Sequence, residues 1–346
     1  MHHLTRRITT AFIVSILSLF TAISSALADE DPNKNWDSDD NDMPMFISDS
    51  NTGYVDNAII QNQFRIRVDS GSNSHFPDMA ELFYGACGCH RVLGLNPSAP
   101  GPAGTLDPSS PMTSPLIETS VDYQELSFDF EYALENNLSL FAELPLRFID
   151  GELLGKEQGL GDIRIGAKFG LLGNSSPHLT AQLRAYLPTG EAKKGLGTDH
   201  YSLEPAILFF SRLNEQWTFS SELRYWIPID GTSGQGTPSK VDYSGDILRF
   251  GVGLGYDFNL DSRTRISPIA ELVTWKILGG QALMSMDGTP MNAQWIEVKG
   301  KVITNFKLGV RANFANKHSI FVGYGEPLSD WELYENIIRL EFRTSY

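Results

Sequence analysis

The hairpin from Gly159 to Gly190 limits the possible folds most, because side-chain type alternates at every residue of both arms. The first arm sets Ile163, Ile165, Ala167, Phe169 and Leu171 against Asp162, Arg164, Gly166, Lys168 and Gly170. Successive side chains of a strand point to opposite faces, so one face is apolar and the other carries charge and glycine. The second arm, residues 179–188, repeats the pattern. Such strands occur in soluble sandwiches and in transmembrane β-barrels, and the rest of the chain separates the two.

The same alternation recurs over most of the chain. Besides the two arms, the pattern predicts strands at 62–68, 121–132, 138–147, 201–209, 217–227, 248–256, 266–275, 302–310, 319–325 and 338–346. Twelve strands in sequence order predict an all-β fold, an antiparallel transmembrane β-barrel with up-and-down meander connections. Strands of about 10 residues rise about 33 Å, and a tilt of about 40° fits them to an apolar belt of about 25 Å.

The lengths of the connections favour a barrel over a sandwich. They alternate between long ones, such as residues 69–119, and short ones, such as residues 135–137. Bacterial barrels have long external loops and short periplasmic turns, whereas a sandwich has no reason to sort its loops. Aromatic residues mark the two expected membrane edges: Phe148, Tyr201, Tyr225 and Tyr324 at the long-loop ends, and Phe209, Trp217, Tyr256 and Tyr346 at the short-turn ends.

The last strand, 338–346, ends in Tyr346 with apolar residues at the alternate positions before it. This pattern is similar to the C-terminal signature of bacterial outer-membrane barrels. We therefore expect the lipid bilayer of the outer membrane to surround the protein. We also expect the outer-membrane barrel assembly machinery to recognise this strand.

The N-terminal region predicts export. Residues 1–28 contain a basic start at Arg6 and Arg7, an apolar stretch, and Ala26-Leu27-Ala28 before the expected cleavage site of a signal peptide. Residues 29–57 are acidic and poor in apolar side chains, so we expect a disordered periplasmic lead. The outer-membrane barrel is then predicted to occupy residues 58–346.

The expected external loop, residues 69–119, is rich in proline and holds both cysteines, Cys87 and Cys89. An exported protein with two cysteines usually oxidises them, although a bridge between residues two positions apart is geometrically strained. The two cysteines are therefore disulfide candidates. We predict no metal site and no cofactor. The sequence Cys87-Gly88-Cys89-His90 is one residue short of a haem-attachment motif, and zinc would need further ligands.

Bulk properties exclude two classes of protein. The formal net charge of −15 argues against a nucleic-acid partner, whose phosphates would be repelled. No apolar run of about 18 residues follows the N-terminal region, which excludes a helical membrane protein. A mean hydropathy of −0.18 remains compatible with a barrel, in which only every second residue faces lipid.

If the apolar faces contact lipid, the opposite faces line the interior. The residues predicted there are Arg65, Arg67, Glu125, Asp129, Glu131, Glu143, Arg147, Asp162, Arg164, Lys168, Arg184, Glu204, Glu222, Arg224, Trp226, Arg249, Lys307, Arg311, Arg339 and Glu341. Buried charges are costly unless they line water or pair with one another. These residues either line a solute path or form a ladder of ion pairs that fills a narrow barrel, and the sequence leaves both open.

Several segments are similar to one known family. They read GLGDIRIGAKFGLL, LRAYLPTG, ELRYWIPI and GDILRFGVGLGYDF. They resemble the outer-membrane barrels grouped with the meta-pathway of phenol degradation, relatives of the long-chain fatty acid transporters, over about Val121 to Tyr346. The resemblance implies an outer-membrane channel or transporter for small solutes of hydrophobic or aromatic character. The chain lacks the Asn-Pro-Ala element of the fatty acid transporters and has fewer predicted strands.

Two other functions remain open. A structural or adhesive surface barrel, which transports nothing, would act through the 69–119 loop. An outer-membrane hydrolase would need a serine, a histidine and a polar orienting residue at the outer edge. His200 and Ser202 share the inward face there, but two residues on one strand do not make a triad. We therefore do not expect an enzyme.

Overall fold

A computed structural model of the chain describes residues 51–74, 94–95, 106–107, 120–151, 155–172, 176–191, 194–198, 200–229, 245–261, 263–285, 293–315 and 317–346. The predicted signal peptide, 1–28, and the disulfide candidates Cys87 and Cys89 lie outside the described residues. Within those residues no helix is long and apolar enough to cross a membrane.

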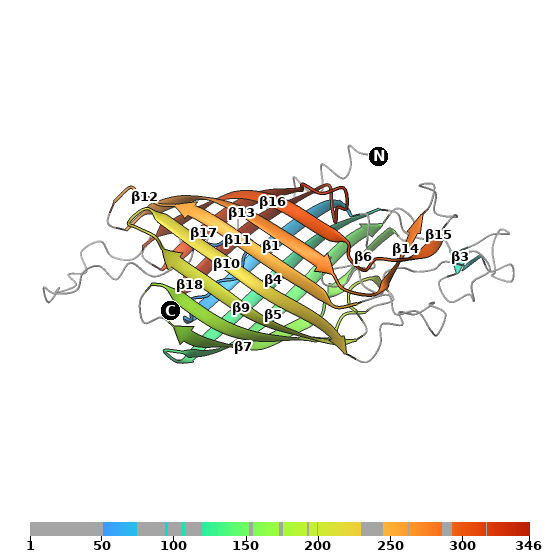
Figure 1. The fold of residues 1–346 in the computed structure, drawn as a ribbon, viewed down its shortest axis with the longest axis horizontal. Coiled ribbons are helices and arrows are strands. Elements are labelled where there is room, and N and C mark those ends of the chain that lie inside the picture. Colours follow the sequence, from blue (N-terminus) through green and yellow to red (C-terminus); the bar gives the residue numbers. More distant parts are fainter. Residues whose placement is uncertain are drawn as a thin grey trace, which may run out of the picture. The chain divides into compact units, whose positions relative to one another are not determined.

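The described chain forms one closed antiparallel barrel of twelve long strands, which are called staves below (Figure 1). Its strands are β1 (Gln63–Ser74), β4 (Val121–Glu135), β5 (Leu138–Gly151), β7 (Ile163–Leu172), β8 (His178–Leu187), β9 (Tyr201–Arg212), β10 (Trp217–Ile229), β11 (Ile247–Tyr256), β13 (Arg265–Ile277), β16 (Val302–Phe314), β17 (His318–Pro327) and β18 (Asn336–Ser345). Each strand pairs with the next in this order, and β1 pairs with β18 to close the sheet. The predicted fold is confirmed.

Shorter strands extend the staves or lie in connections. β6 (Gly155–Leu160) pairs with residues 146–151 of β5, whose residues 138–143 pair with β7. β12 (Phe258–Asn259) pairs with residues 265–266 of β13, whose residues 269–277 pair with β11. β14 (Gln281–Ser285) pairs with β15 (Ala293–Glu297), and β2 (Gly94–Leu95) with β3 (Leu106–Asp107). In Figure 1, β12 and the C-terminus lie at one end of the barrel, called here the short-turn end. β6, β14 and β15 lie at the other, the long-loop end.

The two faces of each stave follow the predicted alternation. On β16, Leu308 points outward and is 52% exposed, whereas Arg311 points inward and is fully buried. The same inversion, with charges buried and large apolar side chains exposed, holds for β4, β8, β11 and β13. A water-soluble sandwich would bury its apolar rows, so the outward rows identify a surface that faces lipid.

Strand β1 is longer than the sequence predicted. It continues to Ser74 instead of ending at Val68, so the predicted external loop does not begin at Asp69. Asp69 is fully buried inside the barrel and accepts hydrogen bonds from Arg339 at 2.7 and 2.8 Å. The polar side chains at 69–74 resemble a loop in composition, but inside a barrel such a side chain can pair with a charge on the neighbouring strand, as Asp69 does with Arg339 of β18.

The structure also differs from the prediction of a disordered lead over residues 29–57. Only residues 51–57 of that range are described, and all except Asp56 are buried. They lie within the barrel, where they bond to side chains of the wall. A hydrophilic segment cannot form a core of its own, but a charged lumen supplies the partners that its polar groups need.

Candidate functional site

The lumen of the barrel is lined by charge. Of the twenty residues predicted to face inward, nineteen are buried in the structure, and the side chain of the other, Arg65, is only 15% exposed. Among the described residues, twelve lysines and arginines and eleven aspartates and glutamates are buried. The near balance of charge shows that these groups mostly compensate one another.

Seven of these residues form a continuous chain of ion pairs across the wall, which we call the ion-pair belt. Its members are Arg147, Glu125, Arg164, Glu143, Arg184, Glu204 and Arg224, in that order, with successive separations of 2.8, 3.0, 3.0, 2.9, 2.8 and 2.5 Å. The belt crosses β4, β5, β7, β8, β9 and β10. Adjacent opposite charges offset the cost of burial, so the belt is a structural part of the wall.

A segment of the chain occupies the space inside this wall. Residues 51–60, called here the lumen loop, precede β1 and fold into the barrel. The backbone N–H groups of Gly53, Tyr54 and Val55 donate to the carboxylate of Glu271 on β13, at 2.9, 2.6 and 3.1 Å. Hydrogen bonds to a charged acceptor are stronger than neutral ones, so Glu271 is a principal anchor of the loop.

Wall arginines bind the carbonyl groups of the same residues. Arg311 donates to Thr52 O at 2.6 Å, Arg339 to Gly53 O at 2.8 Å, and Arg249 to Tyr54 O at 2.9 Å. The backbone at the tip of the loop is therefore held by an anion on one side and by cations on the other.

The ring of Tyr54 contacts two basic side chains of the wall. Lys307 Nζ is 3.9 Å from the ring centroid, and Arg339 Cζ is 4.3 Å from it. Phe321 meets the same ring edge-on, with centroids 6.0 Å apart. Away from water, such cation–π contacts are worth about 2 kcal/mol or more, so they reinforce the backbone anchors.

Both ends of the lumen loop lie near the short-turn end. Ile59 and Ala58 pack in an apolar cluster with Ala206, Leu208 and Phe210 of β9. At the other end Asn51 Nδ2 lies within hydrogen-bonding distance of Asp257, which directly follows β11. The loop therefore enters from the short-turn end, turns at about Tyr54 and returns.

Glycines on β11 make room for the loop. A Cβ atom added at Gly251 would lie 3.1 Å from Val55 Cγ2, and one at Gly255 would lie 3.2 Å from Asn51 Cβ. These glycines occupy the inward positions of β11. Their missing side chains leave the volume that the loop fills.

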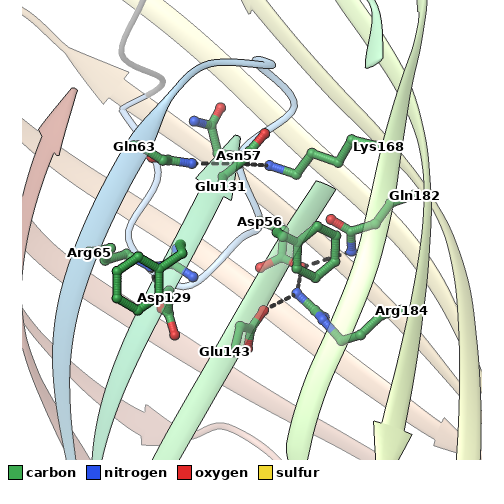
Figure 2. Close-up of a pocket in the computed structure, with 12 residues that line it drawn as sticks. Asp56, Asn57, Gln63, Arg65, Asp129, Glu131, Glu143, Lys168, Gln182 and Arg184 are labelled. Carbon is green, nitrogen blue, oxygen red and sulfur yellow. Dashed lines mark hydrogen bonds and ion pairs between the residues drawn. The ribbon is translucent and has the colours of Figure 1, made fainter. Parts of the chain in front are cut away.

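Asp56 brings a carboxylate to the ion-pair belt (Figure 2). Its Oδ2 atom accepts hydrogen bonds from Arg184 Nη2 at 3.0 Å and Gln182 Nε2 at 3.4 Å, and lies 3.7 Å from Arg224 Nη1. Its backbone N–H donates to Glu222 at 2.9 Å. In Figure 2 the side chains of Asp56, Gln182 and Arg184 converge in the interior.

Two small cavities remain beside Asp56. One of about 30 Å³ extends from Asp56 toward Gln63, Glu131 and Lys168. The other, of about 10 Å³, adjoins Arg224 and Tyr54. A water molecule occupies about 30 Å³ of liquid volume, whereas sites for small organic ligands span about 300–1,000 Å³. With the lumen loop in place, neither cavity accommodates an organic solute.

Toward the long-loop end the interior becomes apolar and aromatic. Its buried cluster includes Tyr123, Tyr186, Trp226, Trp275, Leu333 and Tyr334. Trp226, the one aromatic residue predicted to line the lumen, is part of this cluster. The interior thus changes from an aromatic layer to a charged layer along the barrel axis.

The hydrolase candidates are adjacent. Ser202 Oγ lies 3.2 Å from His200 Nδ1, and Tyr201 O lies 3.1 Å from the same nitrogen. A carbonyl oxygen can only accept, so that contact requires a proton on Nδ1. A protonated Nδ1 cannot take the serine proton, and this geometry is therefore not that of a nucleophile and its base. No metal-binding cluster occurs among the described histidines, cysteines and carboxylates.

Sequence reasoning missed some interior groups. They are Asp69, Asp257, Arg265, Glu271, Arg343 and the lumen loop with Asp56. Glu271 sits on the least regular of the predicted strands, although its alternation with Ala270 and Leu272 places it inward. The lumen loop could have been indicated by β9, whose inward positions change from polar to apolar at Ala206, Leu208 and Phe210, the residues that contact Ala58 and Ile59.

The comparisons with known proteins agree with this fold. Residues 115–230 match the model of the family described as "Putative MetA-pathway of phenol degradation". The resemblance predicted from the sequence is thus confirmed over these residues. Among curated protein sequences, none is similar enough to this chain to count as a match.

The comparison with solved structures finds an outer membrane channel, a porin and a third protein. An outer membrane channel from Pseudomonas putida F1 is 16% identical, with 86% of this chain and 99% of that chain covered and a TM-score of 0.50. The NanC porin is 8% identical over 81% of this chain and 99% of its own, with a TM-score of 0.39. LpxR from Salmonella typhimurium is 8% identical over 82% and 100%, with a TM-score of 0.40. The match to the channel agrees with the outer-membrane β-barrel described above.

Proposed function

We propose that this protein is an outer-membrane channel for small solutes and that the lumen loop closes it. The observation that carries the proposal is the way in which the lumen is filled. The belt belongs to the barrel wall, but residues 51–60 enter from one end and are held by hydrogen bonds to groups on that wall. A filling of this kind can leave while every strand pairing of the barrel is retained.

The solutes proposed are hydrophobic or aromatic in part. The family resemblance supports this class, and the buried cluster at the long-loop end supplies a matching surface. Tyrosine and tryptophan rings offer apolar faces and polar edges to an incoming ring. Because the long loops of bacterial barrels are external, a solute would meet this aromatic layer before the charged one.

Conductance across planar bilayers tests the channel. We expect refolded full-length protein to give infrequent current steps, because the loop closes most molecules, and Glu271→Gln to give frequent ones. In liposomes, Glu271→Gln should also admit phenylalanine faster than leucine. Absence of current and of uptake with both proteins would contradict the proposal and favour a structural or adhesive barrel.

We further propose that the protein is not an enzyme. The arrangement of His200 with Ser202 and Tyr201 O supports this, because it leaves Nδ1 unable to act as a base. Hydrolysis of a chromogenic ester that is lost in His200→Ala would contradict it. Recognition of β18 by the barrel assembly machinery also remains a proposal, supported by the exposed apolar side chains of Ile338 and Tyr346.

A further inference from the structure

We propose that Asp56 occupies an anion-binding site of the lumen and that a small organic carboxylate takes its place when the channel opens. This inference rests on the proposed channel function and adds a class of solute to it. The lumen loop is then an internal substitute for the solute, and the solute itself favours the open state.

The first observation is an imbalance of charge in the ion-pair belt. The belt contains four guanidinium groups and only three carboxylates. Arg184 and Arg224 both approach Glu204, which they contact at 2.8 and 2.5 Å. The carboxylate of Asp56 lies 3.0 Å from Arg184 and 3.7 Å from Arg224, so it is the fourth anion.

The second observation is the lining of the 10 Å³ cavity. Six arginines surround it and only two carboxylates, Asp56 and Glu143. The six are Arg67, Arg164, Arg184, Arg224, Arg249 and Arg339. All six are at least nine-tenths buried. Of the two carboxylates that line this cavity, one, Asp56, belongs to the lumen loop and leaves with it.

Arginine side chains keep their charge at any physiological pH. Withdrawal of the loop would consequently leave one buried positive charge uncompensated, and a buried charge that has lost its partner is strongly unfavourable. An anion that enters as Asp56 leaves removes this cost. A carboxylate suits the site because guanidinium groups bind planar carboxylates through two parallel hydrogen bonds.

The exchange makes opening dependent on the solute. A ligand shifts a two-state equilibrium only by its difference in affinity for the two states. A carboxylate solute cannot share the site with Asp56, so it binds the loop-out state alone and stabilises it. A neutral solute of the same shape gains no such advantage, and a cation is repelled by the surplus arginines.

Hydrogen exchange of the loop amides tests the inference without requiring current. The amides of Gly53 to Asp56 are bonded to Glu271 and Glu222 in the closed state. We expect sodium benzoate to accelerate their exchange at least tenfold, measured by mass spectrometry on the full chain in detergent micelles. Benzyl alcohol, a neutral aromatic molecule, should leave the rate unchanged, while sodium acetate should act in the same direction as benzoate.

Two variants and a control sharpen the test. Arg224→Gln removes the surplus charge and should abolish the response to benzoate. Asp56→Asn should accelerate exchange without benzoate, because the loop no longer competes for the site. Arg343→Gln removes a buried cation that pairs with Glu341 and lines neither cavity, and this variant should respond as the wild type does.

Bilayer recordings separate this inference from the proposed function. A channel that conducts, but whose exchange rate and open probability are the same in benzoate and benzyl alcohol, overturns the anion site and leaves the channel intact. A benzoate-dependent exchange rate in a protein that never conducts supports the anion site and overturns the channel. An equal response in Arg224→Gln and wild type places the anion elsewhere and overturns the inference.

Discussion

The backbone N–H of Tyr54 donates to the carboxylate of Glu271 over 2.6 Å, and this contact joins the tip of the lumen loop to strand β13. The neighbouring N–H groups of Gly53 and Val55 share the same carboxylate. One side chain thus binds all three N–H groups at the turning point of the loop, and its loss should affect closure more than the stability of the barrel.

Glu271→Gln should release the loop. The amide keeps the shape of the side chain but replaces one acceptor oxygen with a donor, which then faces a backbone N–H. Hydrogen bonds to charged groups contribute about 1.5–3 kcal/mol, so we expect the open probability in bilayers to rise at least tenfold. Glu125→Gln is the matched control, because Glu125 pairs with Arg147, Arg164 and Arg67 of the wall. An unchanged open probability in Glu271→Gln would contradict the anchoring role.

Gly53→Ala should also exclude the loop, for a steric reason. A Cβ atom at position 53 would lie 2.3 Å from Phe321 Cζ, far inside van der Waals contact. We expect faster exchange of the loop amides and more frequent openings. Phe321→Ala in the same chain should relieve the clash and restore closure. A double variant as open as Gly53→Ala would show that the ring is not the obstacle.

Asp69 and Arg339 should show strong coupling in stability. Arg339 donates to both carboxylate oxygens of Asp69, at 2.7 and 2.8 Å, and both residues are buried. Asp69→Leu alone should lower the free energy of unfolding by about 3–5 kcal/mol, because it leaves a buried charge uncompensated. Adding Arg339→Leu should recover most of that loss, as measured by urea unfolding in lipid vesicles. Additive losses would mean that the pair does not act as a unit.

The outward apolar rows predict that the loss of stability caused by an outward arginine depends on its depth in the membrane. Leu308 is the central residue of β16 and is 52% exposed, while Val302 begins the same strand and is 43% exposed. Leu308→Arg should destabilise the barrel in vesicles by about 2–4 kcal/mol, and Val302→Arg by about 0–1 kcal/mol. Equal costs at the two positions would contradict the placement of the membrane belt around β16.

The barrel could be predicted from the sequence because its signal is periodic and local. Alternation on strands such as β7 and β16 sets the inward and outward faces whichever strand is the neighbour. The lumen loop could not be predicted in this way. Its binding depends on backbone groups, which every residue carries, and its composition resembles that of an unfolded lead.

Some residues of the barrel strands do indicate the loop, because their inward side chains differ from those expected in an empty lumen. Gly251 and Gly255 omit side chains from inward positions where a filled barrel would have them. Leu208 and Phe210 place apolar groups inward where an open aqueous path would favour polar ones. Two departures from the expected inward chemistry, on β9 and β11, together indicate a segment that packs between them. The charge surplus on Arg184 and Arg224 needed the structure, because it depends on which carboxylates they share.

Because the lumen loop folds back on itself, both of its ends lie at the short-turn end of the barrel, and a force applied there can pull it out. Asn51 and Ile59 are both near the mouth with short turns, and β1 follows the loop directly at the seam with β18. Tension on the chain ahead of Asn51 would therefore peel the loop away one anchor at a time, from Thr52 toward Asp56. The strand pairings of the seam would carry none of that load until the loop was fully extracted.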